Sequence, residues 1–217
     1  KQTCTVTDGE GQVLDPVDRV VIACVRNFAV FQYLKLRAYV DEQGYHAGAL
    51  TDDWFRSYGV QPVNLIYESR LLNCPTPTTC SPSSTLVAKA AATADSTGKI
   101  PVILDAEAWD KHRWHPNSPT ENGLSIVQNL IQLADMFKSY NPGAKIGYYA
   151  ELPQNTFGWS PSVPANYDYL NQQYLPVAAH VDHFAPSLYN YGHDGTEAGE
   201  VNWTLSAQYA INQARLM

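Results

Sequence analysis

Charged residues are scarce in this chain, and basic ones are the scarcer kind. Only 16% of the 217 residues are charged, with 21 acidic against 14 basic side chains and a formal net charge of −7. No run of lysine or arginine occurs anywhere. Because nucleic-acid binding depends on clustered cations that face phosphates, this composition argues against a nucleic-acid partner.

Long hydrophobic runs are also missing. The most apolar stretch near the start, residues 20–40, is interrupted by Arg26, Gln32, Lys35 and Arg37. A transmembrane helix needs about 20 largely apolar residues, so we expect no membrane span. No secretory signal peptide is visible, and the first residue is Lys1 rather than methionine. We therefore expect a chain that begins after processing or is a fragment.

Cysteine is limited to four residues, none in a Cys-x-x-Cys pair or beside a histidine. This spacing predicts no zinc site, and without a glycine-rich phosphate loop we expect no metal and no other cofactor. Cys74 and Cys80 lie close together, which leaves Cys4 and Cys24 as the second natural pair. We predict the disulfides Cys4–Cys24 and Cys74–Cys80, and with them a secreted or extracellular protein.

Two further features agree with secretion. Asn202 opens the sequence Asn-Trp-Thr, which is an acceptor site for N-glycosylation. Aromatic residues reach 12% of the chain, with 14 tyrosines and 5 tryptophans. Tyrosine and tryptophan combine an apolar ring with a polar tip, so they serve well against sugars, although many of them also fill protein cores. The composition favours a carbohydrate partner.

Residues 1–60 predict a small β-rich module. Residues 34–40 alternate between apolar and polar side chains, which is typical of a half-buried strand, and 19–25 is a β-branched run. A helix over 25–39 is the competing interpretation. No catalytic pattern occurs in this part, so a spacer, a lid and an accessory binding module all stay open.

Residues 61–217 alternate strands and helices. Strands are predicted to begin near 63, 101, 145 and 183, and helices to cover 83–94, 125–140, 167–179 and 203–217. Such a series builds a parallel sheet. We predict an α/β fold, a partial or truncated TIM-like (β/α) barrel preceded by a small antiparallel β module, since four units are too few to close a barrel. An open sheet is the alternative.

The predicted strand at 100–104 ends in two carboxylates, Asp105 and Glu107. Residues two apart on a strand point to the same side, so the two acids are expected to lie close together. Neighbouring carboxylates push their pKa values apart, and one of them then keeps a proton near neutral pH. This is the requirement for a general acid.

The other predicted strands also end in polar or aromatic residues. Glu68 follows the first strand, Tyr149 and Glu151 follow the third, and Tyr189 lies at the end of the fourth. The carboxyl ends of parallel strands meet at one edge, so these side chains are expected to converge on one cleft. Carboxylates and aromatic rings in one cleft are typical of a glycosidase.

Three of these segments resemble one family. The sequence Leu-Asp-Ala-Glu-Ala-Trp at 104–109 is similar to the Asp-x-Glu-x-Trp acid motif of the hyaluronidase family of glycoside hydrolases. Gly-Tyr-Tyr at 147–149, followed by Pro153, resembles that family's Trp-Gly-Tyr-Tyr-x-x-Pro strand. Pro-Ser-Leu-Tyr at 186–189 resembles its Pro-Ser-Ile-Tyr strand. The order and approximate spacing agree over about residues 100–190.

The resemblance implies a distorted (β/α) barrel that cleaves beside an N-acetylhexosamine. In that family the second acid of the motif protonates the leaving oxygen, which would be Glu107. Its first acid orients the substrate's acetamido group as internal nucleophile, a role that would fall to Asp105. Tyr149 and Tyr189 would hold the acetamido group and sugar, and Trp109 would stack on the sugar or shape the acid's pocket.

Alternatives remain for the substrate and the mechanism. Asp110 and Lys111 follow Trp109 where the family has Arg-Pro, and few basic residues lie nearby, so another hexosaminide or polysaccharide is as plausible as hyaluronan. Glu68 and Glu151 are predicted to bind substrate or to supply a second catalytic carboxylate. A Glu151 carboxyl at about 5 to 5.5 Å from Glu107 would permit direct double displacement. The competing function is a non-catalytic carbohydrate-binding or structural surface protein on a degenerate barrel.

Overall fold

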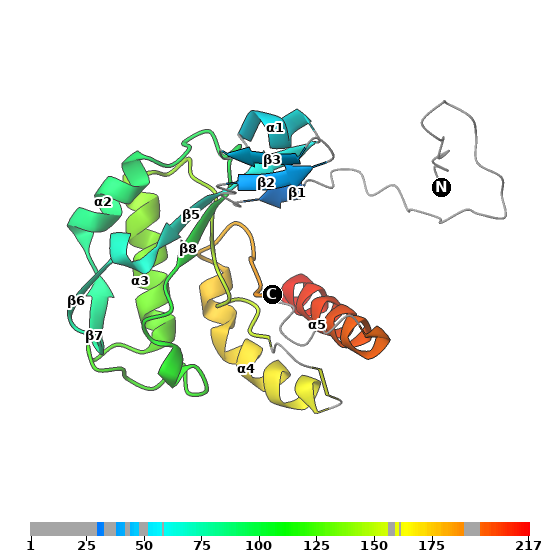
Figure 1. Ribbon diagram of the computed structural model, residues 1–217. Helices are drawn as coiled ribbons and strands as arrows, with labels where there is room; N and C mark the ends of the chain where they lie inside the picture. Colours follow the sequence, from blue (N-terminus) through cyan, green and yellow to red (C-terminus); the bar gives the residue numbers. More distant parts are fainter. Residues whose placement is uncertain are drawn as a thin grey trace, which may run out of the picture.

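The computed structural model describes residues 30–32, 38–41, 44–47, 52–57, 59–155, 159–160, 162–188 and 196–217. Within these residues the fold is mixed α/β, with five α-helices and several small sheets (Figure 1). The α/β class predicted from the alternation of strands and helices is therefore confirmed.

A three-stranded parallel sheet lies at the centre of the fold. Its strands are β5 (Asn64–Tyr67), β8 (Val102–Asp105) and β9 (Ile146–Tyr148), in the spatial order β5-β8-β9. The middle strand is paired along both edges, and its side chains Val102 and Leu104 are fully buried in the hydrophobic core. The sheet confirms three of the four predicted strands.

Helices connect and flank these strands. They are α2 (Ser84–Ala92) between β5 and β8, α3 (Ile126–Tyr140) between β8 and β9, and then α4 (Val163–Ala178) and α5 (Glu197–Leu216). Helix α3 buries one stripe of side chains, as its 3.6-residue periodicity predicts: Ile126, Val127, Leu130, Leu133, Ala134 and Phe137. Helix α5 begins before the predicted position 203 because the Thr196 side chain caps it by accepting a hydrogen bond from the Gly199 amide.

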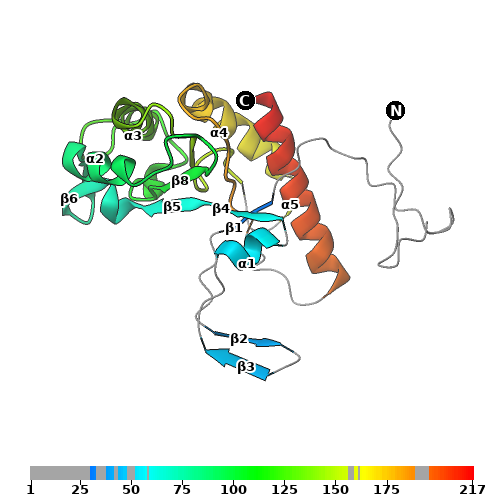
Figure 2. The same ribbon diagram turned by 90° about the horizontal axis from the view of Figure 1, so that it is seen from above.

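The N-terminal part contributes two separate sheets. Strand β1 (Val30–Gln32) pairs in parallel with β4 (Val60–Pro62), while β2 (Ala38–Asp41) and β3 (Gly44–Ala47) form an antiparallel hairpin. Figure 2 shows this hairpin projecting away from the helices and the central sheet. Helix α1 (Asp52–Ser57) follows the hairpin. The strands rule out a helix at 30–32 and 38–41, and the β1–β4 pairing spans the predicted domain boundary at 60/61.

The segment between β5 and α2 forms a β-hairpin. Strands β6 (Leu72–Thr76) and β7 (Thr79–Pro82) pair antiparallel, and the Cys74–Cys80 disulfide joins them with Cα atoms 4.1 Å apart. This disulfide was predicted from spacing and is confirmed. The predicted Cys4–Cys24 pair lies outside the described residues.

The fourth predicted strand, near 183–189, does not form a full strand in the structure. Over the described positions 181–188, pairing is limited to a parallel bridge between Tyr149 and Ala185. Gly147 lies against this segment so closely that a Cβ atom there would come within 2.4 Å of the His183 carbonyl oxygen. The described strands do not close into a barrel.

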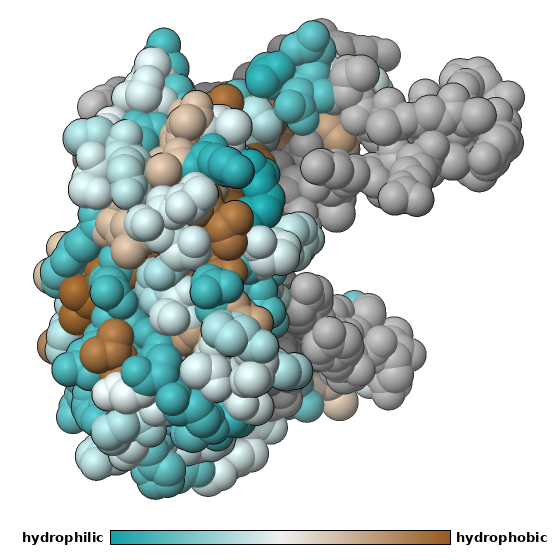
Figure 3. Space-filling model, turned by 90° about the vertical axis from the view of Figure 1, so that its left-hand side faces the viewer, coloured by the Kyte–Doolittle hydropathy of each residue, from teal (hydrophilic) through white to brown (hydrophobic). Residues whose placement is uncertain are grey.

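The exterior shows no membrane-spanning element. None of the helices in the described ranges has the length and apolarity to cross a bilayer. Figure 3 views the molecule from the side that carries α2 and the β6–β7 hairpin, where hydrophobic residues are scattered among hydrophilic ones. The expectation of no membrane span agrees with these findings.

Helix α3 starts at a capping box, whose contribution to stability can be measured. The Ser125 side chain accepts a hydrogen bond from the Gln128 amide (3.2 Å), and the Gln128 side chain accepts one from the Ser125 amide (2.9 Å). Ser125→Ala should lower the free energy of unfolding by about 1 kcal/mol because the first turn loses a partner. Ser139→Ala at the exposed end of the same helix is the matched control. Urea unfolding with equal loss in both variants would contradict the assignment.

Candidate active site

The carboxyl edge of the central sheet brings together acidic side chains from three strands. Glu68 opens the 3-10 turn η2 (Glu68–Arg70) directly after β5, Asp105 is the last residue of β8, and Glu151 follows β9 by three positions. The register pairs Tyr67 with Asp105, so Glu68 lies just beyond the acid of the neighbouring strand. The strand-end acids predicted from sequence thus share one edge.

Asp105 is half-buried at this edge. Its burial is the main cause that raises its pKa to about 6, and the negative charges of Glu68 and Asp110 add to the effect. One oxygen of Glu68, Oε2, is buried without a hydrogen-bond partner in the described structure. Since buried carboxylates close together cannot all ionise, this cluster retains protons at a pH where isolated acids would be charged.

Glu107 is the more exposed member of the predicted pair. Strand β8 ends at Asp105, so Glu107 lies in the turn beyond it, where its carbonyl oxygen accepts a hydrogen bond from the Asp110 amide (3.0 Å). Ala106 between the two acids is buried, while Asp105 and Glu107 are both more exposed, and their shared face stays a prediction. The two acids interact, because partial burial and the charges of Asp105, Asp110 and Glu68 raise the pKa of Glu107.

Asp110 was not predicted as a site residue, yet it lies within this cluster. It begins the 3-10 turn η3 (Asp110–His112), and its side chain is hydrogen-bonded to that of Glu151. Burial raises the pKa of Asp110, while the bond to Glu151 and the charge of Arg113 oppose the rise. Its position directly after the Asp-x-Glu-x-Trp segment could have marked Asp110 as a candidate site residue, but nothing in the sequence indicates a contact with Glu151.

Glu151 points into the protein, with only 3% of its surface exposed. Ala150 before it takes the left-handed conformation with φ 59°, which is uncommon for a residue other than glycine. The Glu151 amide then donates to the Tyr149 carbonyl (2.8 Å) in a tight turn that directs the side chain inward. Burial and the nearby charges of Asp110 and Glu107 raise the pKa of Glu151 well above its usual range.

A buried amide network fixes the Glu151 turn. The Gln154 side chain donates to the carbonyl oxygen (3.2 Å) and to Oε2 (3.3 Å) of Glu151. Asn171 of α4 accepts from the Gln154 amide (2.7 Å) and donates to its carbonyl (3.1 Å). It also donates to the Tyr209 hydroxyl of α5 (3.4 Å). The turn is thereby tied to two helices.

The predicted aromatic partners take different positions. Trp109 is only 2% exposed, and its indole N–H donates to the Cys80 carbonyl (3.2 Å). Its ring is therefore buried and is not presented to solvent. The Tyr149 hydroxyl lies 3.1 Å from the Ser187 hydroxyl, which links the third strand to the segment after Ala185. Tyr189 lies outside the described residues.

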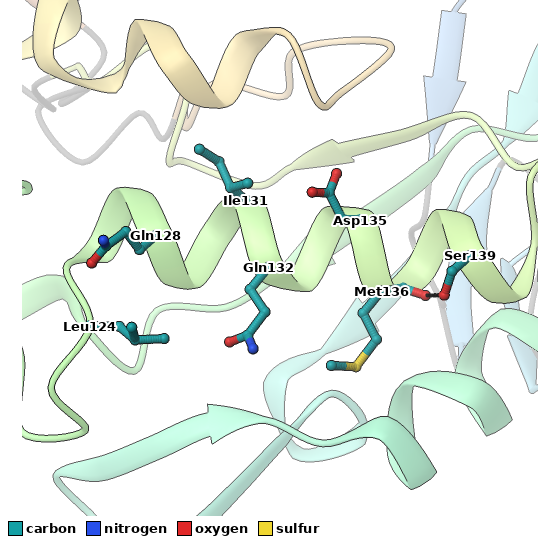
Figure 4. Close-up of a pocket in the computed structure, with 7 residues that line it drawn as sticks. All are labelled: Leu124, Gln128, Ile131, Gln132, Asp135, Met136 and Ser139. Carbon is teal, nitrogen blue, oxygen red and sulfur yellow. Dashed lines mark hydrogen bonds between the residues drawn. The ribbon is translucent and has the colours of Figure 1, made fainter.

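Other surface features do not coincide with the acidic cluster. A groove follows one side of α3, lined by Leu124, Gln128, Ile131, Gln132, Asp135, Met136 and Ser139 (Figure 4). None of the cluster's acids lines it. In the described part of the chain no group of three or more His, Cys, Asp or Glu side chains is placed to hold a metal ion.

Asn202, the predicted glycosylation site, is exposed on α5.

Comparisons with known proteins leave the family open. No protein-family model matches the sequence, and the search of curated proteins finds none that matches it. The resemblance of residues 100–190 to hyaluronidase motifs therefore stays a prediction.

The raised pKa of Asp105 predicts a pH-dependent stability. Its folded value of about 6 exceeds the ordinary 3.8, so the folded state binds this proton more tightly than the unfolded state. This tighter proton binding stabilises the folded state. The stabilisation is complete below the pKa of Asp105 in the unfolded chain and is lost as pH rises through its pKa in the folded protein. Asp105→Asn lacks the titration, so its free energy of unfolding relative to the parent should increase between about pH 5 and pH 7.

Asp95→Asn is the matched control for this urea-unfolding series. Hydrogen bonds from the backbone of Ile100 and Thr97 lower the pKa of Asp95 to about 2. Asp95 is therefore ionised in both states from about pH 5 to pH 7, and its variant should differ from the parent by a constant amount. A constant difference for Asp105→Asn as well would contradict the placement of Asp105 in a repulsive, half-buried cluster.

Proposed function

We propose that this protein is a secreted glycoside hydrolase in which Glu107 is the proton donor and Asp105 its assistant. The observation that carries the proposal is the exposed Glu107 carboxyl beside half-buried acids. Partial burial and the charges of Asp105, Asp110 and Glu68 all oppose its ionisation. A general acid must reach the substrate and still hold its proton near the working pH. The exposure and the raised pKa of Glu107 both favour this role.

The proposed reaction uses the two acids in different protonation states. Glu107 transfers its proton to the glycosidic oxygen as the bond to the sugar carbon breaks. Asp105, with a pKa of about 6, is ionised above that pH and orients the acetamido group of an N-acetylhexosamine, which attacks the sugar carbon from within the substrate. In this proposal Tyr149, whose hydroxyl lies 3.1 Å from that of Ser187, holds the same group.

The burial of Glu151 supports substrate assistance over direct double displacement. A nucleophilic carboxylate must reach the sugar carbon, whereas Glu151 is 3% exposed and engaged by Gln154 and Asp110. Its expected role in touching the substrate is therefore replaced, in this proposal, by a supporting role. Glu68 and Trp109 support the site in the same way, since Trp109 is bound to Cys80 and faces the interior.

The finer fold proposed is part of a (β/α) barrel. The parallel pairings follow chain order: β1 with β4, β5 with β8, β8 with β9, and Tyr149 with Ala185. Strands β4 and β5 are separated only by Val63. Sequential parallel strands with intervening helices are the arrangement of such barrels, whose active sites lie at the carboxyl ends of the strands. The acidic cluster occupies that edge.

Glu107→Gln tests the proton donor. Glutamine keeps the size of the side chain but has no proton to transfer, so turnover on a panel of N-acetylhexosaminides and other polysaccharides should fall by about a hundredfold or more. Glu121→Gln is the matched control, because Glu121 contacts Lys111 and His112 at the surface and takes no part in the cluster. Its turnover should equal that of the parent.

Near-normal hydrolysis by Glu107→Gln would exclude Glu107 as the general acid. Glycan binding measured by calorimetry, with no product released from any member of the panel, would favour the second candidate function, a non-catalytic carbohydrate-binding protein. That candidate is favoured by one observation, the incomplete closure of the described strands. Circular dichroism of each variant confirms that the fold is intact.

A further inference from the structure

Asp110 and Glu151 form a contact between two acids that the proposed reaction does not use. The side chains come from different loops, Asp110 from the turn after β8 and Glu151 from the turn after β9, and they are hydrogen-bonded to each other. Two carboxylates can form such a bond only if one of them carries a proton, because an ionised carboxylate has no donor. The contact therefore stores one proton and one negative charge.

The surroundings decide which acid holds the proton. Glu151 is almost fully buried, and burial is the largest cause raising its pKa. Asp110 is less enclosed, and Arg113 favours its ionised form. Glu151 thus donates the hydrogen bond and Asp110 accepts it, so that the negative charge rests on Asp110.

We propose that Asp110 and Glu151 are a positioning pair that shares one proton and holds a single negative charge beside Glu107. The inference rests on the proposed function only in assigning Glu107 the role of proton donor. The pair itself touches no substrate. Its effect is to keep the Glu107 carboxyl protonated through electrostatic repulsion from Asp110.

A backbone hydrogen bond places Asp110 in the same turn as Glu107. The Asp110 amide donates to the Glu107 carbonyl (3.0 Å), so the charged member of the pair belongs to the same turn as the proton donor. Trp109, between them in sequence, anchors the turn through its bond to Cys80 of the disulfide hairpin. The Glu151 turn is held separately by Gln154 and Asn171. Hydrogen bonds thus hold both turns, the one with Glu107 and Asp110 and the one with Glu151.

Several other groups interact with one or both acids of the pair and must be included in any titration. They are Asp105, Glu107, Arg113, Tyr148 and Tyr174, while Glu68 acts on Asp105 and Glu107. Arg113 is the cation among them, and the two tyrosines are buried neutral phenols. The net field at Glu107 is therefore negative, and Asp110 is one of its sources.

Carboxyl-carbon NMR titration of the full-length chain tests the proposal without requiring activity. In Asp110→Asn the charge is lost, so Glu107 should titrate at a lower pH than in the parent protein. In Glu151→Gln the new amide can still donate to Asp110, so the titration of Glu107 should stay where it is. Asp95→Asn is the control for an aspartate outside the cluster.

Two results would overturn the proposal. An unchanged Glu107 titration in Asp110→Asn would show that the pair is purely structural. A lowered Glu107 titration in Glu151→Gln would place the charge on Glu151 instead. If Asp110→Asn does not fold, the parent spectrum decides, because near neutral pH Glu151 must show the carbon shift of a protonated acid and Asp110 that of a carboxylate. Two ionised carbons would contradict the pairing.

The outcome is separable from that of the proposed function. If the protein cleaves no glycan, the NMR titration still measures whether the pair controls Glu107. If it does cleave one, the alkaline limb of the pH–rate profile, which reports the general acid, should move to lower pH in Asp110→Asn and stay in place in Glu151→Gln. A change in turnover without movement of that limb would indicate a structural role.

Discussion

The site depends on strand β8, which is paired along both edges and buries the side chains of one face. Its edges are hydrogen-bonded to β5 and β9, and its side chains Val102 and Leu104 have no exposed surface. An ionised group would be costly among such buried side chains. Asp105, at its last position, is therefore only half enclosed, and Glu107 beyond it is the acid that reaches solvent.

Burial and like charge then act together on the acids at this edge. Glu68, Asp105, Glu107, Asp110 and Glu151 lie near enough to influence one another, and Arg113 is the one cation among the groups that shift their pKa values. Each acid that gives up its proton makes the next ionisation harder. The result is a gradient of burial, from Glu151, which is only 3% exposed, to the exposed Glu107.

Distant elements hold this gradient in place. The disulfide hairpin β6–β7 supplies the Cys80 carbonyl that binds Trp109, and helix α4 supplies Asn171, which binds Gln154 beside Glu151. Helix α5 joins through the Tyr209 hydroxyl. These bonds are buried, so each would cost about 1–3 kcal/mol to leave unsatisfied. These hydrogen bonds therefore tie together segments that lie far apart in the chain.

Local patterns in the sequence determined the α/β class, the three buried strands, the α3 stripe, the Cys74–Cys80 disulfide and the acids at the strand ends, because periodicity and spacing act over a few residues. They placed the central strand at 100–104 instead of Val102–Asp105, because the bounds of β8 depend on its neighbours in the sheet. Only the tertiary structure decided the Asp110–Glu151 contact. It requires the left-handed backbone at Ala150 and a turn after β8, which together bring side chains 41 positions apart into one hydrogen bond.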